Sequence, residues 1–345
     1  MLPTDLPSDM PTFLARFGSD QACREHLFKL RWPDGFRCRA CGLPKYYAHA
    51  DRLVYECAAC RAHNSLLAGT VFEQTKTSLR KWFLAIFLFS SSKGGIAAAE
   101  LKRQMGFGSE QTAWTWLHKL RRAMVVPDRQ PLSGTVEVDE SYVGGPEPGK
   151  RGRGAGGKVL VACAVETSTR VVEAPDPERF SGIVRTLSQL LAAKIAKGLV
   201  APRRCLGRAR LAVLGDASAK SLEPFVKSAI DGAATVVTDG HSGYLGLARQ
   251  SIDHERIVLS KTDGPAHEHL PAVHLVFTLL KRLILGTYHG AVSSRHFQHY
   301  LDEYVFRFNR KSAAQGARVG RLVALAVTTL PVRNWMILGH AQRPS

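Results

Sequence analysis

Two Cys-x-x-Cys pairs stand close together near the start of the chain, Cys38/Cys41 and Cys57/Cys60, with 15 residues between them. Each pair presents two thiolates from a tight turn, and four thiolates complete the tetrahedral coordination of one zinc ion. Because the protein then fills all four positions, none is left for chemistry. We therefore predict a structural Zn²⁺ site, in which metal binding replaces the hydrophobic core that so small a module cannot build.

The four cysteines could instead form redox-active pairs, or their spacing could be a chance arrangement. The stretch between the pairs, LPKYYAHADRLVYE, has the alternation of a short β-hairpin, which is typical of a zinc ribbon. Residues 1–73 are therefore predicted to hold an N-terminal helix and a zinc ribbon. The isolated cysteines are expected to be small buried residues: Cys23, Cys163 and Cys205.

Two aspartates suggest a different chemistry. Asp139 lies in VEVDESYVGG and Asp239 in ATVVTDG, within or at the end of predicted strands. If the strands are adjacent, the carboxylates could hold one or two Mg²⁺ ions, which prefer hard oxygen ligands. Such ions activate a water or 3′-hydroxyl and stabilise the leaving oxygen of a phosphodiester. Aspartates before turns are also common, so the spacing alone leaves this assignment open.

An α/β domain must position these aspartates. GTVEVDESYVGG, KVLVACAVE and RARLAVLGDAS are predicted strands, KSLEPFVKSAI is a predicted helix, and ATVVTDG is a fourth strand. Two helices are expected after them, around HLVFTLLKRLIL and SRHFQHYLDEYVFRFNR. Residues 167–205 carry a Leu- and Ala-rich helical pattern, which indicates an insertion between the second and third strands.

Residues 74–130 are predicted to form a helix-turn-helix-like DNA-binding region. IAAAELKRQMGFGSEQTAWTWLHKLRRAM has the pattern of two helices joined by a short turn that contains glycine. Apolar residues of the second helix recur at helical spacing and should face inward: Ala113, Trp116 or Leu117, Leu120 and Ala123. The remaining face is predicted to contact DNA through Gln111, Thr115, His118, Lys119 and Arg122. The alternative is a helical pair without a DNA role, but the basic outer face favours DNA.

The charge balance indicates a polyanionic partner. The 345 residues include 47 Lys and Arg against 29 Asp and Glu, a formal net charge of +18. This excess favours double-stranded DNA, although a basic protein can be merely soluble. Acids and prolines precede any apolar run at the N-terminus, and the longest apolar run, WFLAIFLF, is too short to span a membrane. We therefore expect a cytoplasmic protein with no membrane partner.

Four segments resemble the DDE transposases of bacterial insertion sequences: VEVDESYVGG, TDGHSGY, HLVFTLLKRLILGTYHGAV and YLDEYVFRFNRK. The ribbon, followed by AGTVFEQTKTSLRKWFLAIFL, is similar to the ISXO-like branch of these enzymes. The resemblance covers roughly residues 10–315. It implies an RNase H-like catalytic domain at 131–315, catalytic Mg²⁺ or Mn²⁺, and action on element ends and target DNA as a homo-oligomer. Residues 316–345 are left as a C-terminal tail.

The resemblance also implies the catalytic residues. Asp139 and Asp239 would be the first two members of the metal-binding triad. The usual third member is a helical Glu, followed seven residues later by Lys or Arg. Lys281 fits the basic position, and two helical turns place it on the same face as His274. His274 is therefore expected to replace the Glu, with an ordinary surface histidine as the alternative.

Two acidic residues are weaker candidates for the third position. Glu268 has the wrong spacing to the basic residue, and Glu303 is expected to cap or pair within the last helix. The leading functional prediction is a transposase. The alternatives are a zinc-ribbon and helix-turn-helix regulator with an inactive catalytic domain, and a nuclease that cuts DNA without joining it.

Overall fold

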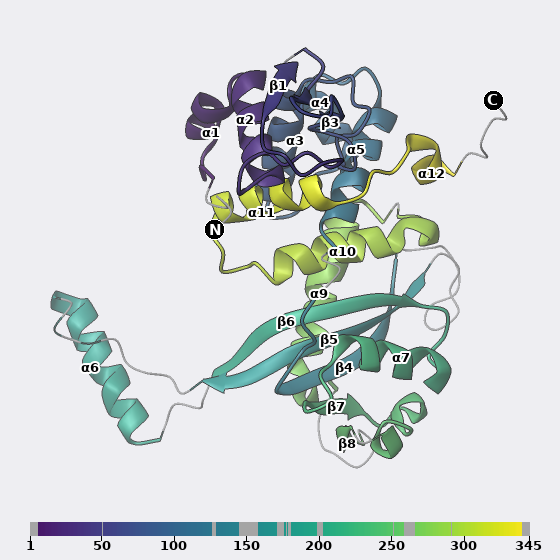
Figure 1. The fold of residues 1–345 in the computed structure, drawn as a ribbon. Coiled ribbons are helices and arrows are strands. Elements are labelled where there is room, and N and C mark those ends of the chain that lie inside the picture. Colours follow the sequence, from purple (N-terminus) through teal and green to yellow (C-terminus); the bar gives the residue numbers. More distant parts are fainter. Residues whose placement is uncertain are drawn as a thin grey trace. The chain divides into compact units, whose positions relative to one another are not determined.

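The computed structural model describes residues 6–49, 51–125, 129–144, 158–170, 176, 178, 181–198, 203–250, 252–258, 266–290 and 292–339. The chain divides into two compact units, which are treated separately below (Figure 1). The first unit contains Met1–Arg129, Gly144–Lys150 and Lys281–Ser345. The second contains Gln130–Val143 and Arg151–Leu280.

The first unit begins with two short helices, α1 (Met10–Phe17) and α2 (Asp20–Arg31). Each follows a capping residue, Asp9 or Ser19, whose side-chain oxygen accepts a backbone N–H of the first turn. A three-stranded antiparallel sheet comes next and holds the second cysteine pair at its end. Its strands, in the order β1-β2-β3, are Tyr46–His49, Val54–Cys57 and His63–Ser65.

Three helices follow the ribbon: α3 (Leu79–Ser91), α4 (Ala98–Met105) and α5 (Glu110–Ala123). α4 ends at Gly106, whose φ of 62° is a left-handed conformation that glycine adopts without a side-chain penalty. Ser109 then accepts a first-turn N–H and begins α5. The two helices and turn predicted from the sequence are thus present.

The inward face predicted for α5 is confirmed. Ala113, Leu117 and Leu120 are each no more than 1% exposed, and Trp116 is also buried. The indole of Trp116 stacks on that of Trp82 from α3, with ring centroids 3.5 Å apart. Offset or stacked aromatic pairs of this kind strengthen a core beyond the area that they bury.

Helix α11 (Gln315–Thr328) is part of the first unit's core, so the expectation of a tail at 316–345 is wrong for this helix, and residues 340–345 lie outside the described residues. It buries Val319, Leu322 and Ala326 completely. The carbonyl of Ala326 also accepts the N–H of Val71 at 3.0 Å. The apolar residues in RLVALAV recur at helical spacing, and this pattern indicates a buried helix that was not predicted.

The expected catalytic domain at 131–315 does not coincide with either unit, because residues from 281 onward group with the first. Helix α9 (Pro271–Gly286) runs across that division. After it come a short 3₁₀ helix η5 (Ser294–His296), α10 (Phe297–Phe308) and α12 (Asn334–Leu338).

The second unit is built on a five-stranded mixed sheet with the order β6-β5-β4-β7-β8 (Figure 1). The antiparallel strands are β4 (Thr135–Val143), β5 (Val159–Arg170) and β6 (Arg203–Leu214). β7 (Thr235–Asp239) pairs parallel to β4, and β8 (Asp253–Ile257) pairs parallel to β7. Four of these strands were predicted, whereas β8, a polar and partly exposed edge strand, was missed.

Helix α7 (Ala219–Ala229) covers one face of this sheet. Leu222 and Val226 from the helix pack in one core with Val136 and Val138 from β4. Successive residues of a strand point to opposite faces, so residues 137 and 139 lie on the face away from α7. The alternation therefore separates the apolar face of Val136 and Val138 from the acidic face of Glu137 and Asp139, whereas Glu140 lies on the α7 side.

The segment predicted as an insertion contains α6 (Gly182–Ala196), and part of that segment lies outside the described residues. Its apolar side chains are largely exposed: Ile183, Val184, Leu187 and Leu190. The remaining short elements of the second unit are η2 (Ser242–Tyr244), η3 (Ala248–Gln250) and α8 (Ala266–His269).

Candidate functional site

Strands β4 and β7 bring the two predicted catalytic aspartates to neighbouring positions. Val138 pairs with Thr238 in the parallel ladder, and Asp139 and Asp239 are the next residues on each strand. Neighbouring residues of a paired register share a face, so both carboxylates lie on the sheet face away from α7. Each also accepts a backbone N–H from just after it in the chain, at 2.8 Å for Asp139 and 3.0 Å for Asp239.

Glu137 joins this face to helix α9. Its buried carboxylate accepts the N–H groups of Ala272 and Val273 at 2.8 and 3.0 Å. These donors belong to the first turn of the helix, where they have no partner within the helix and where negative charge is favourable. The helix is thereby held so that Nε2 of His274 lies 3.9 Å from Oδ2 of Asp139.

Glu140 organises the other side of the sheet. Its Oε2 accepts the hydroxyl of Tyr244 at 2.7 Å, and its Oε1 lies 4.0 Å from Nδ1 of His241. Burial, reinforced by the charge of Glu140, raises the pKa of Tyr244 far above its usual range, so the phenol stays a protonated donor. This contact ties β4 to the turn that follows Asp239.

Neither Glu137 nor Glu140 was predicted from the sequence as a site residue. The sequence feature that could have indicated them is the presence of three acidic residues within VEVDE. Side chains alternate along a strand, so Glu137 lies on the same face as Asp139 and Glu140 lies on the opposite face. A cavity of about 230 Å³ opens on the Glu137 side, between the sheet and α8, and Val237 and His269 are among its lining residues.

The predicted triad is assembled only in part. Asp139 and His274 approach each other, and Asp239 lies on the adjacent strand. Among the described residues, however, these three do not bring their ligand atoms within 4.8 Å of one another. Lys281 lies two turns beyond His274 on α9, as the spacing requires.

The two weaker candidates for the third position lie elsewhere. Glu268 is exposed on α8. Glu303 is completely buried, accepts from Arg121 Nε at 2.8 Å and from the Tyr288 hydroxyl at 2.9 Å, and pairs with Arg307. It is a structural ion-pair residue, as expected from the sequence.

The four ribbon cysteines form a closed cluster. All four sulfurs lie within 4.8 Å of one another, with Cys38 to Cys60 at 3.6 Å and Cys41 to Cys57 at 3.5 Å. Sulfurs bound to a tetrahedral zinc ion at about 2.3 Å are about 3.8 Å apart, so the cluster fits Zn²⁺. Within each knuckle a backbone N–H, that of Cys41 or of Cys60, does most to lower the pKa of the first thiol.

Asn64 supports the ribbon from β3 and was not singled out by sequence. It is 3% exposed, and its Oδ1 accepts the N–H of Arg39 at 3.0 Å. Its Nδ2 donates to the carbonyls of Tyr55 and Ala62 and lies 3.7 Å from the sulfur of Cys38. Contacts of this kind orient a metal ligand.

The predicted DNA-contact face of α5 needs correction. Thr115 and His118 are 3% and 1% exposed, so the expectation that they lie on the outer surface is wrong. Gln111 and Arg122 are exposed and Lys119 is half-buried. The buried face of α5 is wider than its apolar residues alone predicted, because other helices of the first unit cover α5 on more than one side.

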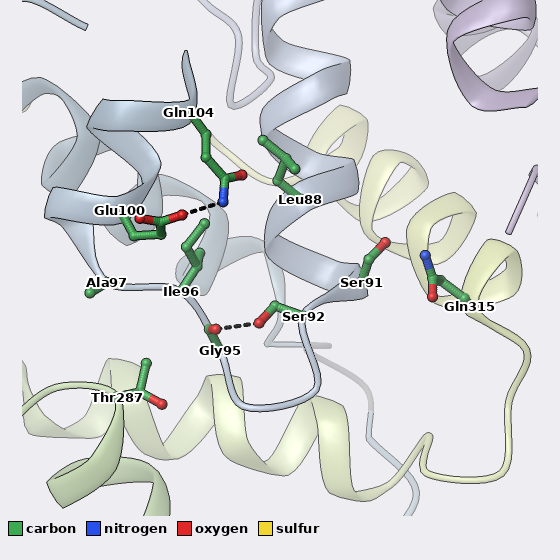
Figure 2. Close-up of a pocket in the computed structure, with 10 residues that line it drawn as sticks. All are labelled: Leu88, Ser91, Ser92, Gly95, Ile96, Ala97, Glu100, Gln104, Thr287 and Gln315. Atoms are coloured by element: carbon green, nitrogen blue, oxygen red, sulfur yellow. Dashed lines mark hydrogen bonds between the residues drawn. The ribbon is translucent and has the colours of Figure 1, made fainter. Parts of the chain in front are cut away.

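A separate cavity of about 580 Å³ lies in the first unit, between α3 and the start of α4 (Figure 2). Leu88 and Ile96 give it apolar walls. Figure 2 shows Gln104 donating to Glu100 and the Ser92 hydroxyl donating to the Gly95 carbonyl. None of the residues predicted to act on DNA lines it.

Hydropathy gives one further finding: among the described helices, none combines the length and apolar character needed to cross a bilayer.

Comparisons with known proteins match two parts of the chain. Residues 131–309 match the ISXO2-like transposase domain, and residues 18–63 match the transposase zinc-ribbon domain. A stretch of 140 residues is 29% identical to an uncharacterized protein in transposable element ISH50 of Halobacterium salinarum. That stretch covers 40% of this chain and 45% of the relative, so less than half of the relative is matched. No solved structure matches the chain. The zinc ribbon and the resemblance predicted from the sequence are confirmed.

Proposed function

The chain belongs to the family defined by the ISXO2-like transposase domain, and from this we propose that it cleaves the ends of an insertion sequence and joins them to target DNA. The observation that carries the proposal is the pairing of β4 with β7. In that ladder Val138 pairs with Thr238, and the residues that follow them, Asp139 and Asp239, support a shared site on one face of the sheet. The five-stranded mixed sheet also supports an RNase H-like fold for the catalytic region.

Carboxylate oxygens are the ligands that Mg²⁺ and Mn²⁺ prefer, so Asp139 and Asp239 fit a catalytic divalent ion. His274 adds an imidazole nitrogen beside Asp139, which suits Mn²⁺ better than Mg²⁺. When bound, the ion would supply Lewis-acid stabilisation of the phosphodiester oxygens.

Two residues of the chain are proposed to organise the site: Glu137 orients helix α9, and Lys281 contacts the DNA. Glu137 holds the start of α9 and so fixes where His274 stands relative to Asp139. Lys281, two turns along, is proposed to bind a phosphate of the substrate. Glu137 is a positioning residue here, because Oε2 of its carboxylate accepts both helix N–H groups.

End recognition is assigned to the zinc ribbon and the α4–α5 pair. Gln111, Lys119 and Arg122 remain available on α5 for DNA, and the net charge of +18 favours contact with phosphates. Joining two ends of one element requires both to be held together, so we propose that the chain acts as a homo-oligomer on DNA.

A DNA-binding regulator is the second candidate function. The observation that favours it is the incomplete gathering of Asp139, Asp239 and His274 among the described residues. A regulator needs end binding but no metal-dependent cleavage, so the two functions differ in a single assay.

The test incubates the purified chain with labelled DNA carrying the element's own ends, a target plasmid, and Mg²⁺ or Mn²⁺. The proposal predicts metal-dependent joining of labelled ends to the plasmid. Binding without cleavage in either metal would support the regulator, and cleavage without joining would support a nuclease.

A further inference from the structure

Three histidines that the transposase chemistry does not use meet inside the first unit. His118 comes from α5, His296 ends η5, and His299 lies in the first turn of α10. Each offers a ring nitrogen, and these nitrogens all lie within 4.8 Å of one another. Among the residues that the structure describes, the ribbon cysteines are the one other group in which at least three His, Cys, Asp or Glu ligand atoms lie this close together.

The central histidine is buried without hydrogen bonds. His118 is 1% exposed, and neither of its ring nitrogens has a hydrogen-bond partner among the described residues. Nδ1 of His299 is also buried and lacks a hydrogen bond there. A buried polar atom left unpaired loses its hydrogen bonds to water without replacement, so such atoms call for an explanation.

The surroundings suit a ligand set held by rigid walls. The Trp114 ring lies 4.0 Å from the His118 ring, and the Tyr300 ring lies 5.5 Å from it, centroid to centroid. Oδ2 of Asp302, a buried carboxylate, is 4.0 Å from Nδ1 of His299. At 4.0 Å this carboxylate is not hydrogen-bonded to the ring, but its negative charge when ionised would favour a cation beside His299.

Three arginines near this group carry positive charge, which would oppose a cation: Arg121, Arg122 and Arg295. Arg121 lies next to this group, but its Nε donates to the buried Glu303 carboxylate at 2.8 Å. The positive charge of Arg121 is therefore balanced by Glu303 within the same core. Asp302 adds a further carboxylate beside the histidines.

We propose that His118, His296 and His299 bind one divalent transition-metal ion, of the zinc type, in addition to the ion of the ribbon. Three imidazoles are a recurrent zinc ligand set, with a fourth position left for water. Ring nitrogens bound to one zinc ion are about 3.3 Å apart. The three observed nitrogens lie within 4.8 Å of one another, so small rotations of the rings would bring them to that spacing. Mg²⁺ is unsuited because it prefers oxygen ligands.

The ion would connect parts of the first unit that are far apart in sequence. His118 belongs to the predicted DNA-binding helix pair, whereas His296 and His299 follow α9, nearly 180 residues later. The proposed site would thus fix α5 against α10. It does not depend on whether the chain cuts DNA.

The test loads the full chain with excess zinc, removes loose metal by gel filtration and measures bound zinc. We expect about two zinc ions per chain for the wild type and about one for His296→Gln/His299→Gln, which keeps the ribbon. The matched control is His289→Asn, an exposed histidine at a left-handed φ of 52° that Asn tolerates, and it should keep two. One zinc in the wild type, or two in the double variant, would overturn the proposal.

Cobalt titration of the unmodified protein gives a second readout that does not depend on a variant folding. The ribbon ion should add the intense thiolate-to-cobalt charge-transfer band, and a further equivalent should add only weak visible bands from a nitrogen-ligated ion. Spectral changes that end when the thiolate band saturates would contradict a histidine site.

Discussion

His274 is the residue at which this chain departs most from a three-carboxylate site. It lies 3.9 Å from Asp139 through its Nε2 and brings no negative charge when neutral. We therefore predict that cleavage depends more on Mn²⁺ than it would with a glutamate there. His274→Glu should keep or increase cleavage with Mg²⁺, and His274→Ala should lose most cleavage with both ions.

The measurement is the rate of cleavage of end-containing DNA with each ion. The matched control is Leu275→Ala, which removes an exposed neighbour on the same helix and should leave the rate unchanged. Wild-type rates for His274→Ala in both metals would show that the third ligand lies elsewhere.

Glu137 is predicted to act through the helix that it anchors. Glu137→Ala leaves the N–H groups of Ala272 and Val273 without their acceptor, and we expect cleavage to fall by about 10–100-fold, as for other supporting contacts around metal ligands. Glu178→Ala is the control, because Glu178 is an exposed carboxylate of the same unit that does not line the cavity beside Glu137. Equal effects of the two variants would argue against a positioning role.

At the scale of elements, a buried ion pair holds α5 to α10. Arg121 and Glu303 are 1% and 0% exposed in their side chains, and the Arg121 guanidinium also lies 4.0 Å from the Tyr300 ring centroid. Burial alone would raise the pKa of Glu303, but Arg307 and Arg121 lower it below its usual value of 4.5. In the folded state Glu303 is therefore ionised and pairs with the two arginines.

Glu303→Gln should lower the free energy of unfolding by about 3–5 kcal/mol at neutral pH, because it leaves buried arginine charge uncompensated. The lowered pKa means that this contribution is present above about pH 4.5 and is lost as the pH falls through the folded-state pKa. Denaturant unfolding of wild type and variant should therefore converge in acid. A constant gap down to low pH would contradict this account, and Glu25→Gln, an exposed helical carboxylate, serves as control.

The ribbon is the other element with a direct test. Cys57→Ser removes one of four thiolates from a cluster that fits zinc, so the ribbon ion should be lost and the N-terminal region destabilised. Metal analysis of the purified protein checks this. Cys205→Ser, at a cysteine outside the cluster, is the control and should keep full zinc content.

At the scale of the whole molecule, the sequence predicted the parts whose signals are local. The cysteine spacing, the strands around Asp139 and Asp239, and the two helices of the α4–α5 pair were all found. The C-terminal helix α11 and the burial of Thr115 and His118 were not. These depend on which helices pack together across the sequence, and a single helix's apolar stripe does not reveal how many neighbours cover it.

The overall charge gives a prediction for the complete chain. DNA binding by a protein of net charge +18 should weaken by about 10³-fold or more between 50 and 200 mM salt, because phosphate contacts release condensed counterions. Fluorescence anisotropy on end-containing and unrelated DNA would measure this. Affinity that is insensitive to salt would argue against phosphate contacts as the main source of binding.

The central claim is that Asp139 and Asp239 form the cleavage centre, and one comparison tests it most directly. Asp139→Asn and Asp239→Asn are assayed beside the wild type and Asp231→Asn, an exposed aspartate of the same unit, for both binding and cleavage of end-containing DNA. Both site variants should bind the ends with wild-type affinity but release no cleaved strand in Mg²⁺ or Mn²⁺, whereas Asp231→Asn should cleave normally. Cleavage by either site variant at the wild-type rate would contradict it.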